Sequence, residues 1–242
     1  MNDPRYQQLF HYAEHITPYL HGELKAEIDI QQDNWIEASA ENAELLQDIY
    51  SKLQFSHPEA GNAYWLNRTW SLLLWQPIYI SFISIYGIHA LPQVSKMAQQ
   101  WRAEVNFVSG FKLPESKMFE GDVESLVHHA AAELLPLFEH YRQQLDQNVR
   151  IRPGYTQHLL ADLLLMALLR LQDIYTDLPQ DYIWQHAQTW LKAFGLSCKP
   201  LESLNYDEID QKWHFVRTTC CMVYRCEGRG MCPDCPRAKK LK

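Results

Sequence analysis

Apolar residues recur along most of the chain with the spacing of an α-helix. Positions three and four residues apart fall on one face of a helix, so such a repeat predicts a helix that buries that face. The repeat predicts helices around residues 9–16, 45–53, 123–134, 159–171 and 183–194. The run at 159–171 is apolar on nearly every side, which is typical of a helix in the middle of a core.

Proline and glycine mark where these helices end or bend. The second helix should stop before His57-Pro58, and the third should be kinked at Pro136 because proline there removes a backbone donor and crowds the preceding turn. Gly195 follows the last helix at the position where a left-handed residue commonly ends one.

Signals for β-strands are sparse. Val105 and Phe107 alternate with polar neighbours before Gly110, which predicts a short strand or hairpin, and residues 213–216 are a second candidate. We therefore expect an α+β fold that is predominantly helical. The most suitable boundary lies between Gly195 and Pro200, which predicts a helical domain at 1–197 and a cysteine-rich C-terminal module at 198–242.

The segment 69–95 contains no Lys, Arg, Asp or Glu and is nearly long enough to span a membrane. Ser71, Gln76 and His89 interrupt it, and Pro77 should break it. It is therefore predicted to form a buried pair of helical segments, with its tryptophans in the core, and peripheral membrane contact stays open.

Charge is distributed unevenly. The chain has 22 basic and 29 acidic residues and a net charge of −7, whereas residues 217–242 carry seven basic and two acidic side chains. A basic C-terminus on an acidic body predicts an anionic partner there, either an acidic electron-carrier protein or an anionic iron chelate. Nucleic acid is not expected, because the overall balance is acidic and the basic residues are few.

The most informative feature is the clustering of cysteine. Five of the six cysteines lie in the last 23 residues, and four of them form the pattern C-C-x10-C-x2-C. These four are Cys220, Cys221, Cys232 and Cys235. The N-terminus lacks the basic start and apolar run of a signal peptide, which predicts a reducing cytoplasm where free thiols can bind a metal.

Zinc, an iron–sulfur cluster and an unmetallated redox dithiol are the alternatives for this pattern. Only Cys232-Pro233-Asp234-Cys235 has the spacing of a zinc knuckle. The adjacent Cys220 and Cys221 point in different directions in any regular backbone, so both reach one small ion only if the backbone is distorted. Two iron atoms present a wider target, and ligand geometry therefore favours a cluster over zinc without excluding it.

The flanking residues carry a family resemblance. The stretch V-R-T-T-C-C-M-V-Y-R at 216–225, followed by C-P-D-C at 232–235, resembles the C-terminus of the FhuF-type ferric siderophore reductases. In that family a V-R-x-T-C-C-x-x-Y-R stretch and a later C-x-D-C hold a [2Fe–2S] cluster with the same gap. The uncharged Trp-rich segment after Asn67-Arg68 is similar in order and character. Cys226 departs from the pattern and raises the question whether it replaces a ligand.

The resemblance implies a function and a ligand set. The four cysteines would hold a [2Fe–2S] cluster, through which a ferric siderophore of the hydroxamate type is reduced by one electron and Fe(II) is released in the cytoplasm. Because the chain has no nucleotide-binding motif, electrons would come from a ferredoxin or another donor protein. Arg217 and Arg225 are expected to orient the anionic chelate or the donor. The alternatives are a zinc-stabilised binding module without redox activity and, more weakly, a chelate-binding role like that of related siderophore-synthesising ligases.

Overall fold

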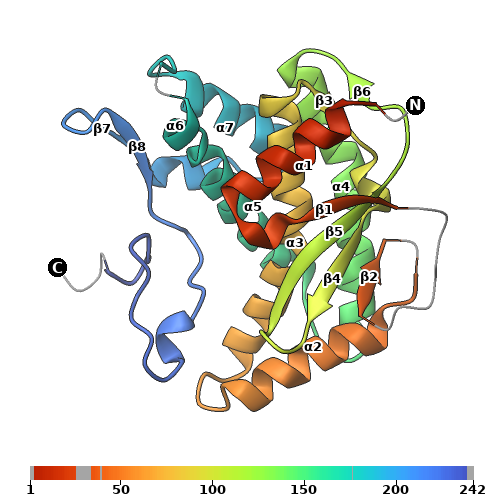
Figure 1. Cartoon of the computed structure of the whole chain (residues 1–242). Coiled ribbons are helices and arrows are strands. Elements are labelled where there is room, and N and C mark those ends of the chain that lie inside the picture. The colour runs from red at the N-terminus through yellow and green to blue at the C-terminus, as the bar shows by residue number, and fades with distance from the viewer. Residues whose placement is uncertain (1–2, 26–33, 39, 176, 239–242) are drawn as a thin grey trace.

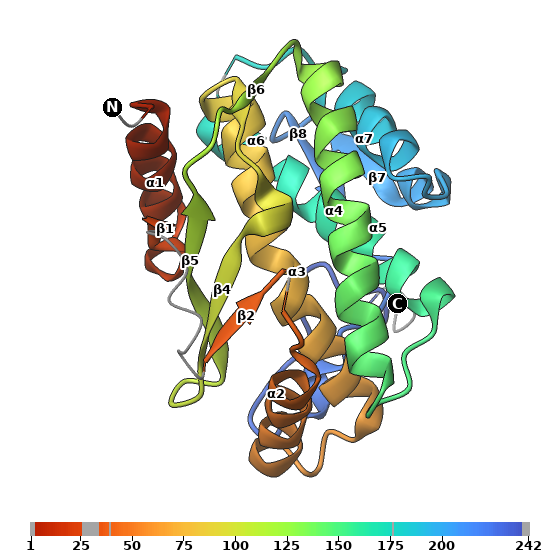
Figure 2. The same cartoon turned by 90° about the vertical axis from the view of Figure 1, so that its right-hand side faces the viewer.

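The computed structural model describes residues 3–25, 34–38, 40–175 and 177–238. The long helix α3 (Asn62–Gly87) runs through the middle of the molecule (Figure 1). On one side of it lie α1 (Arg5–Ile16) and a four-stranded sheet, and on the other lie α4 (Val123–Asp146), α5 (Pro153–Leu169) and α7 (Tyr182–Ala193) (Figure 2). The short helix α6 (Leu171–Ile174) follows α5, and α2 (Ala43–Ser56) packs on α3 and α4. The predicted class, α+β and predominantly helical, is confirmed.

The five helices predicted from apolar spacing are all present. The second ends at Ser56, directly before His57, and the last is followed by Gly195 with a φ of +60°. A left-handed residue there favours glycine, because side chains with a Cβ rarely adopt that backbone. The third predicted helix, α4, continues through Pro136 to Asp146.

The four-stranded sheet has the order β1-β5-β4-β2. Its strands are β1 (Gly22–Lys25), β2 (Trp35–Glu37), β4 (Ala98–Arg102) and β5 (Phe107–Pro114). Strand β1 pairs with β5 in parallel, and the other pairs are antiparallel. The hairpin expected near Phe107 is confirmed as β4–β5, with Asn106 at a φ of +52° in its turn and Val105 in the turn rather than in a strand.

Two small sheets complete the described strands. Strand β3 (Ala90–Leu91) pairs with β6 (Phe119–Glu120), and β7 (Leu204–Asp207) pairs with β8 (Lys212–Phe215). The second pair contains the strand predicted at 213–216. Leu204 and Phe215 pack into the main hydrophobic core, so this hairpin belongs to the body of the fold. The division into domains at 197/198 stays a prediction.

The prediction that Pro77 separates two helical segments is wrong, because α3 is continuous from Asn62 to Gly87. A proline inside a helix costs about 3 kcal/mol through the lost hydrogen bond and the clash with the preceding turn. Here Leu73, Leu74 and Ile78 around it are fully or almost fully buried, and burial of such side chains contributes roughly 1.5–3 kcal/mol each. Packing on several sides therefore offsets the local cost of the proline.

Within the described residues, no helix is both long enough and apolar enough to cross a membrane.

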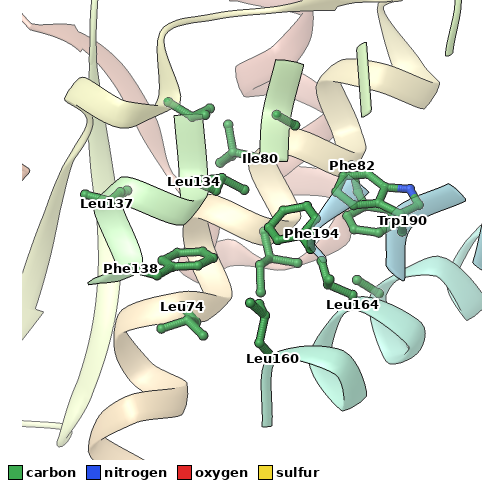
Figure 3. Close-up of a cluster of buried hydrophobic side chains, with 14 of the residues drawn as sticks. Leu74, Ile80, Phe82, Leu134, Leu137, Phe138, Leu160, Leu164, Trp190 and Phe194 are labelled. Atoms are coloured by element: carbon green, nitrogen blue, oxygen red, sulfur yellow. The ribbon is translucent and has the colours of Figure 1, made fainter. Parts of the chain in front are cut away.

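The core is built from the helices that surround α3. Phe82 of α3 stacks on Trp190 of α7 with ring centroids 4.1 Å apart and planes 9° apart (Figure 3). Leu160 and Leu164 of α5 lie below this pair in the same view, which explains why the apolar face of α5 extends around most of the helix. The centre of the molecule is thus an apolar contact of three helices.

The C-terminal segment, residues 216–238, differs from the rest. It contains one short 3-10 turn at Val223–Arg225 and is otherwise irregular. Figure 1 shows it in blue, as loops beside the half of α3 that begins at Asn62. The four patterned cysteines lie in this segment.

Candidate metal centre

The four patterned cysteines meet as two pairs of thiols. The sulfur atoms of Cys221 and Cys232 are 3.2 Å apart, and Cys220 lies close enough to Cys235 for the two thiols to influence each other electrostatically. A disulfide has a sulfur separation of about 2.05 Å, so these thiols are free. The adjacent Cys220 and Cys221 therefore each face a different cysteine of the C-P-D-C knuckle.

Backbone contacts within the segment create this pairing. The amide of Cys235 donates to the carbonyl of Cys232 at 3.1 Å, which closes the knuckle, and the amide of Arg217 donates to the carbonyl of Asp234 at 3.1 Å. Met222 has a left-handed backbone with a φ of +60°, which turns the chain directly after the adjacent cysteines. The two ends of the pattern are thereby brought together.

A single buried carboxylate fixes the turn that precedes the adjacent cysteines. Asp162 on α5 is 2% exposed. It accepts hydrogen bonds from the amides of Thr218 and Thr219 at 3.0 and 2.7 Å and from both of their hydroxyl groups. Four bonds to one buried carboxylate satisfy its charge without a cation partner, because hydrogen bonds to charged groups are the strong class.

Helix α3 holds the other side of the adjacent cysteines. The amide group of Asn67 donates to the carbonyl of Cys220 at 3.1 Å, and Asn67 is 4% exposed. Tyr155, from the first turn of α5, contacts Asn67 and lies close to Cys220. The central helices α3 and α5 thus position Cys220 and Cys221 from two directions.

Arg217 connects the two cysteine pairs electrostatically. Its guanidinium forms an ion pair with Asp234 at 2.6 Å and donates to the sulfur of Cys221 at 3.4 Å. Burial opposes its charge, but Cys221, Asp234 and Cys232 together hold the pKa of Arg217 above its usual value. Arg217 therefore stays charged beside the thiols and favours their thiolate forms.

The two thiols of the closer pair differ in acidity. Burial acts to raise the pKa of Cys221, but the Val223 amide, Cys232 and Arg217 outweigh it and the pKa is lowered. Burial and the neighbouring Cys221 raise the pKa of Cys232 to about 11. Of this pair, Cys221 is thus the thiol that deprotonates first, and it is the one that accepts a hydrogen bond from Arg217.

A basic hollow opens onto this pair. It has a volume of about 390 Å³, and Cys221 and Cys232 form part of its wall. Three guanidinium groups also line it, those of Arg68, Arg217 and Arg229. Burial lowers the pKa of Arg68, while the neighbouring Tyr64, Cys221 and Cys226 act in the opposite direction. We call this hollow the basic pocket.

The basic pocket continues into a second hollow of about 540 Å³, with which it shares Arg68, Ser71 and Leu163. The wall of this second hollow includes four aromatic rings, those of Tyr19, Trp75, Tyr79 and Phe107, among aliphatic, polar and charged side chains. Trp70 is buried, as predicted for the tryptophans of this segment, but Trp75 and Tyr79 face this hollow. A long ligand would therefore meet charge next to the cysteines and aromatic rings farther from them.

Two predicted residues lie apart from the thiols. The guanidinium of Arg225 is exposed, does not line the basic pocket, and contacts the carbonyl of Ala60 at 3.4 Å. Cys226 is 3% exposed and packs with Ala60 and Tyr64 between α2 and α3. The structure therefore brings Arg217 to the cysteine pairs, whereas Arg225 stays outside the basic pocket and Cys226, which lines that pocket, packs on Ala60 and Tyr64 instead of pairing with a patterned cysteine.

This donor set fits a two-iron cluster. Four thiols in two pairs match the two irons of a [2Fe–2S] cluster, each of which takes two protein thiolates. The arrangement also removes the difficulty of the adjacent cysteines, because they need not reach the same ion. Residues 217–237 match the family model described as the FhuF 2Fe-2S C-terminal domain.

This segment is a 2Fe-2S domain of the FhuF type.

The match confirms the predicted resemblance for residues 217–237 and the predicted [2Fe–2S] cofactor, and it makes the chain an iron–sulfur protein. The helical part of the chain lies outside the matched residues, so the wider extent of the resemblance stays a prediction. No solved structure matches the chain.

Sequence reasoning missed three residues of this FhuF-type site. Asp162 is the only charged residue in the apolar run 159–169, which was its one visible signal. Arg68 is the last charged residue before the uncharged segment, and Asn67 precedes it. All three residues contact or face the cysteine segment from more than 50 positions away in the sequence, and a local sequence pattern does not reveal contacts over such a distance.

Proposed function

We propose that this protein is a ferric siderophore reductase that releases Fe(II) in the cytoplasm, with Cys220, Cys221, Cys232 and Cys235 as the cluster ligands. The bound cluster supplies a single electron, and ferrous iron is held far less tightly than ferric iron by hard oxygen chelators. The observation that supports this function best is the basic pocket, whose wall contains two of the four cluster cysteines, Cys221 and Cys232, and three arginines. Hydroxamate chelates are the proposed substrate class.

The arginines give the pocket two functions. Guanidinium groups donate hydrogen bonds to oxygen atoms in fixed directions, so Arg68 and Arg229 can hold the oxygen-rich face of a chelate toward the cysteines. Reduction adds one negative charge to the bound complex, and prearranged positive groups stabilise charge that develops during a reaction. Arg217, ion-paired with Asp234, is held in place before the substrate arrives.

The electron donor is proposed to be a ferredoxin or another electron-transfer protein. Three of the four cluster cysteines are partly exposed, and Arg225, Arg229 and Arg237 lie exposed on the same segment. A basic rim around a redox centre suits an acidic donor surface, because complementary charge speeds encounter. Arg225 is therefore better placed for the donor than for the chelate.

Single-turnover kinetics tests the proposal. The protein is reduced without oxygen, freed of reductant, and mixed with the ferric complex of a trihydroxamate chelator, while the cluster absorption and trapped Fe(II) are followed. We expect reoxidation of the cluster with one Fe(II) formed per chain, and inhibition by the matching Ga(III) complex, which binds alike but accepts no electron. A reduced cluster that stays reduced in the presence of the chelate would refute the proposal.

Two charge-removing variants separate the roles of the arginines. Arg68→Gln should weaken chelate binding by about 10-fold or more, because a hydrogen bond to a charged group contributes roughly 1.5–3 kcal/mol. Arg225→Gln should leave chelate binding unchanged and slow reduction by the donor protein. The measurement is the chelate-concentration dependence of cluster reoxidation, with iron content as the check for an intact cluster. Equal loss of chelate affinity in both variants would contradict the assignment.

A further inference from the structure

A second group of metal-ligand side chains lies beside the basic pocket. His57, Glu59 and Cys226 place one imidazole nitrogen, one carboxylate oxygen and one sulfur within 4.8 Å of one another. His57 and Glu59 come from the connection between α2 and α3, and Cys226 comes from the C-terminal segment. His57 and Cys226 also line the basic pocket, so the group borders the space next to Cys221 and Cys232.

Contacts independent of the four patterned cysteines hold this group together. The amide of Glu227 donates to Glu59 Oε1 at 2.9 Å, and His57 Nδ1 lies 3.6 Å from the same oxygen. Cys226 packs with Ala60 and Tyr64 and influences the Tyr64 hydroxyl electrostatically. The loop that carries Cys226 is therefore held against the α2–α3 connection by a hydrogen bond and by packing. This explains why Cys226 does not lie with the four patterned cysteines.

We propose that His57, Glu59 and Cys226 form a separate site for one divalent metal ion, which is Fe(II) during turnover. Nitrogen, oxygen and thiolate ligands together suit borderline ions such as Fe(II) and Zn(II). One carboxylate and one thiolate balance the charge of a divalent ion. A trivalent ion would leave an unbalanced positive charge close to Arg68 and Arg229, which both interact electrostatically with the neighbouring Tyr64. The site therefore selects the reduced form of iron.

This role in turnover rests on the proposed function. Fe(II) that leaves a chelate in the basic pocket would exchange oxygen ligands of the chelate for His57, Glu59 and Cys226. No electron moves in this exchange, and the proton of the Cys226 thiol passes to solvent. The site would keep the weakly chelated product from rebinding to the chelate and hand it on to solution or to an acceptor.

Zinc binding to the cluster-loaded protein tests the site itself, because Zn(II) is redox-silent. Equilibrium dialysis, with zinc and iron counted in the same sample, should find one zinc per chain and unchanged iron. Cys226→Ser and His57→Ala should weaken zinc binding by more than about 10-fold, since changes at metal-site residues typically cost 10- to 100-fold. Cys198→Ser, at an exposed cysteine, and His214→Ala, in the exposed Asp207–Asp210–His214 group, are the matched controls.

The outcomes decide the site in either direction. Zinc binding that is lost in Cys226→Ser and in His57→Ala but kept in both controls supports it, provided that the cluster spectrum is unchanged in every variant. Zinc binding that is equal in Cys226→Ser and the parent, or zinc that enters only as iron leaves, overturns it.

Release kinetics then separates this inference from the proposed function. In single turnover with the ferric trihydroxamate, Glu59→Gln, at the one residue of the group that does not line the basic pocket, should reoxidise its cluster at the parental rate but deliver Fe(II) to a ferrous chelator in solution faster than the parent. A parent cluster that is not reoxidised refutes the reductase and leaves the zinc result standing. Equal release in both proteins refutes the role of the site in turnover alone.

Discussion

The helical core and the C-terminal segment are held together in different ways. In the core, Phe82, Trp190 and their neighbours are buried against one another, and burial of such side chains is the main source of stability. In residues 216–238 only Cys226 and Cys235 are buried, and the segment is attached through polar contacts to Asp162 and Asn67. A segment with so little apolar burial depends on its metal for a fixed structure.

Cys232→Ser should give the largest effect, because it should abolish the metal centre of the C-terminal segment without changing the helical core. Losing one ligand of the closer pair should abolish the cluster, while the helical core, which makes no use of the metal, keeps its structure. We expect iron, sulfide and the visible spectrum to disappear with little change in far-ultraviolet circular dichroism.

Cys198→Ser is the matched control, because Cys198 is exposed and outside the cysteine pairs. A Cys232→Ser protein that retained its full iron content would show that Cys226 can replace a ligand. Its loss of helical signal would instead show that the two regions fold together.

Trp190→Ala tests whether the stability of the core is independent of the metal centre. Trp190 is fully buried, stacks on Phe82 and donates from its indole to the hydroxyl of Tyr86 at 2.9 Å. Truncation of a buried aromatic side chain costs about 3–5 kcal/mol of unfolding free energy. Urea unfolding should show this loss, while iron per folded chain stays unchanged. Trp184→Ala, on the same helix but half-buried, should cost clearly less.

Asp162→Asn acts at the junction of the two regions. Asparagine keeps the shape of the side chain but loses its charge, and its NH2 group faces amides and hydroxyl groups that themselves donate. We therefore expect the attachment of the Thr218–Thr219 turn to α5 to lose about 2–3 kcal/mol of free energy. Hydrogen exchange at the Thr218 and Thr219 amides should accelerate, and a chelator should strip the cluster faster. Asp173→Asn, at an exposed ion pair with Lys212, is the control and should change neither. Unchanged exchange in Asp162→Asn would mean that the cluster alone holds the segment.

The same contrast explains what the sequence could predict. Helices α1, α2, α4, α5 and α7 follow from apolar spacing because each has a repeat that reports its buried face. Strands β1 and β2 were missed because each is only three or four residues long, and strand pairing distant in sequence leaves little local signal. The continuity of α3 through Pro77 is decided by tertiary packing, which local propensity does not contain.

For the metal site, the cysteine spacing and the V-R-T-T-C-C flank predicted the cofactor, because cluster ligands lie close together in sequence. The supports of those ligands were not predictable in this way. Asp162 and Asn67 reach the cysteine segment only after the chain has folded, and the basic pocket exists only where α3, α5 and the segment meet. Arg225 is about as close to the adjacent cysteines in sequence as Arg217 is. Its guanidinium nevertheless contacts the carbonyl of Ala60, whereas that of Arg217 donates to the sulfur of Cys221.

His186→Gln should give the smallest effect and concerns the core alone. The hydroxyl of Tyr86 accepts from the indole of Trp190, and its own proton is available for Nδ1 of His186, 2.9 Å away, when the imidazole is neutral with Nδ1 unprotonated. Burial lowers the pKa of His186 from its usual 6.5. As the pH falls through the interval between the unfolded and the folded pKa, the unfolded chain binds a proton that the folded protein does not. The free energy of unfolding therefore decreases over that interval and levels off below the folded pKa. Urea midpoints from about pH 7.5 to about pH 5.5 should show this decrease in the parent and a flatter profile in His186→Gln. Iron content should be the same in both proteins at each pH, and a difference would mean that the core and the metal site are coupled.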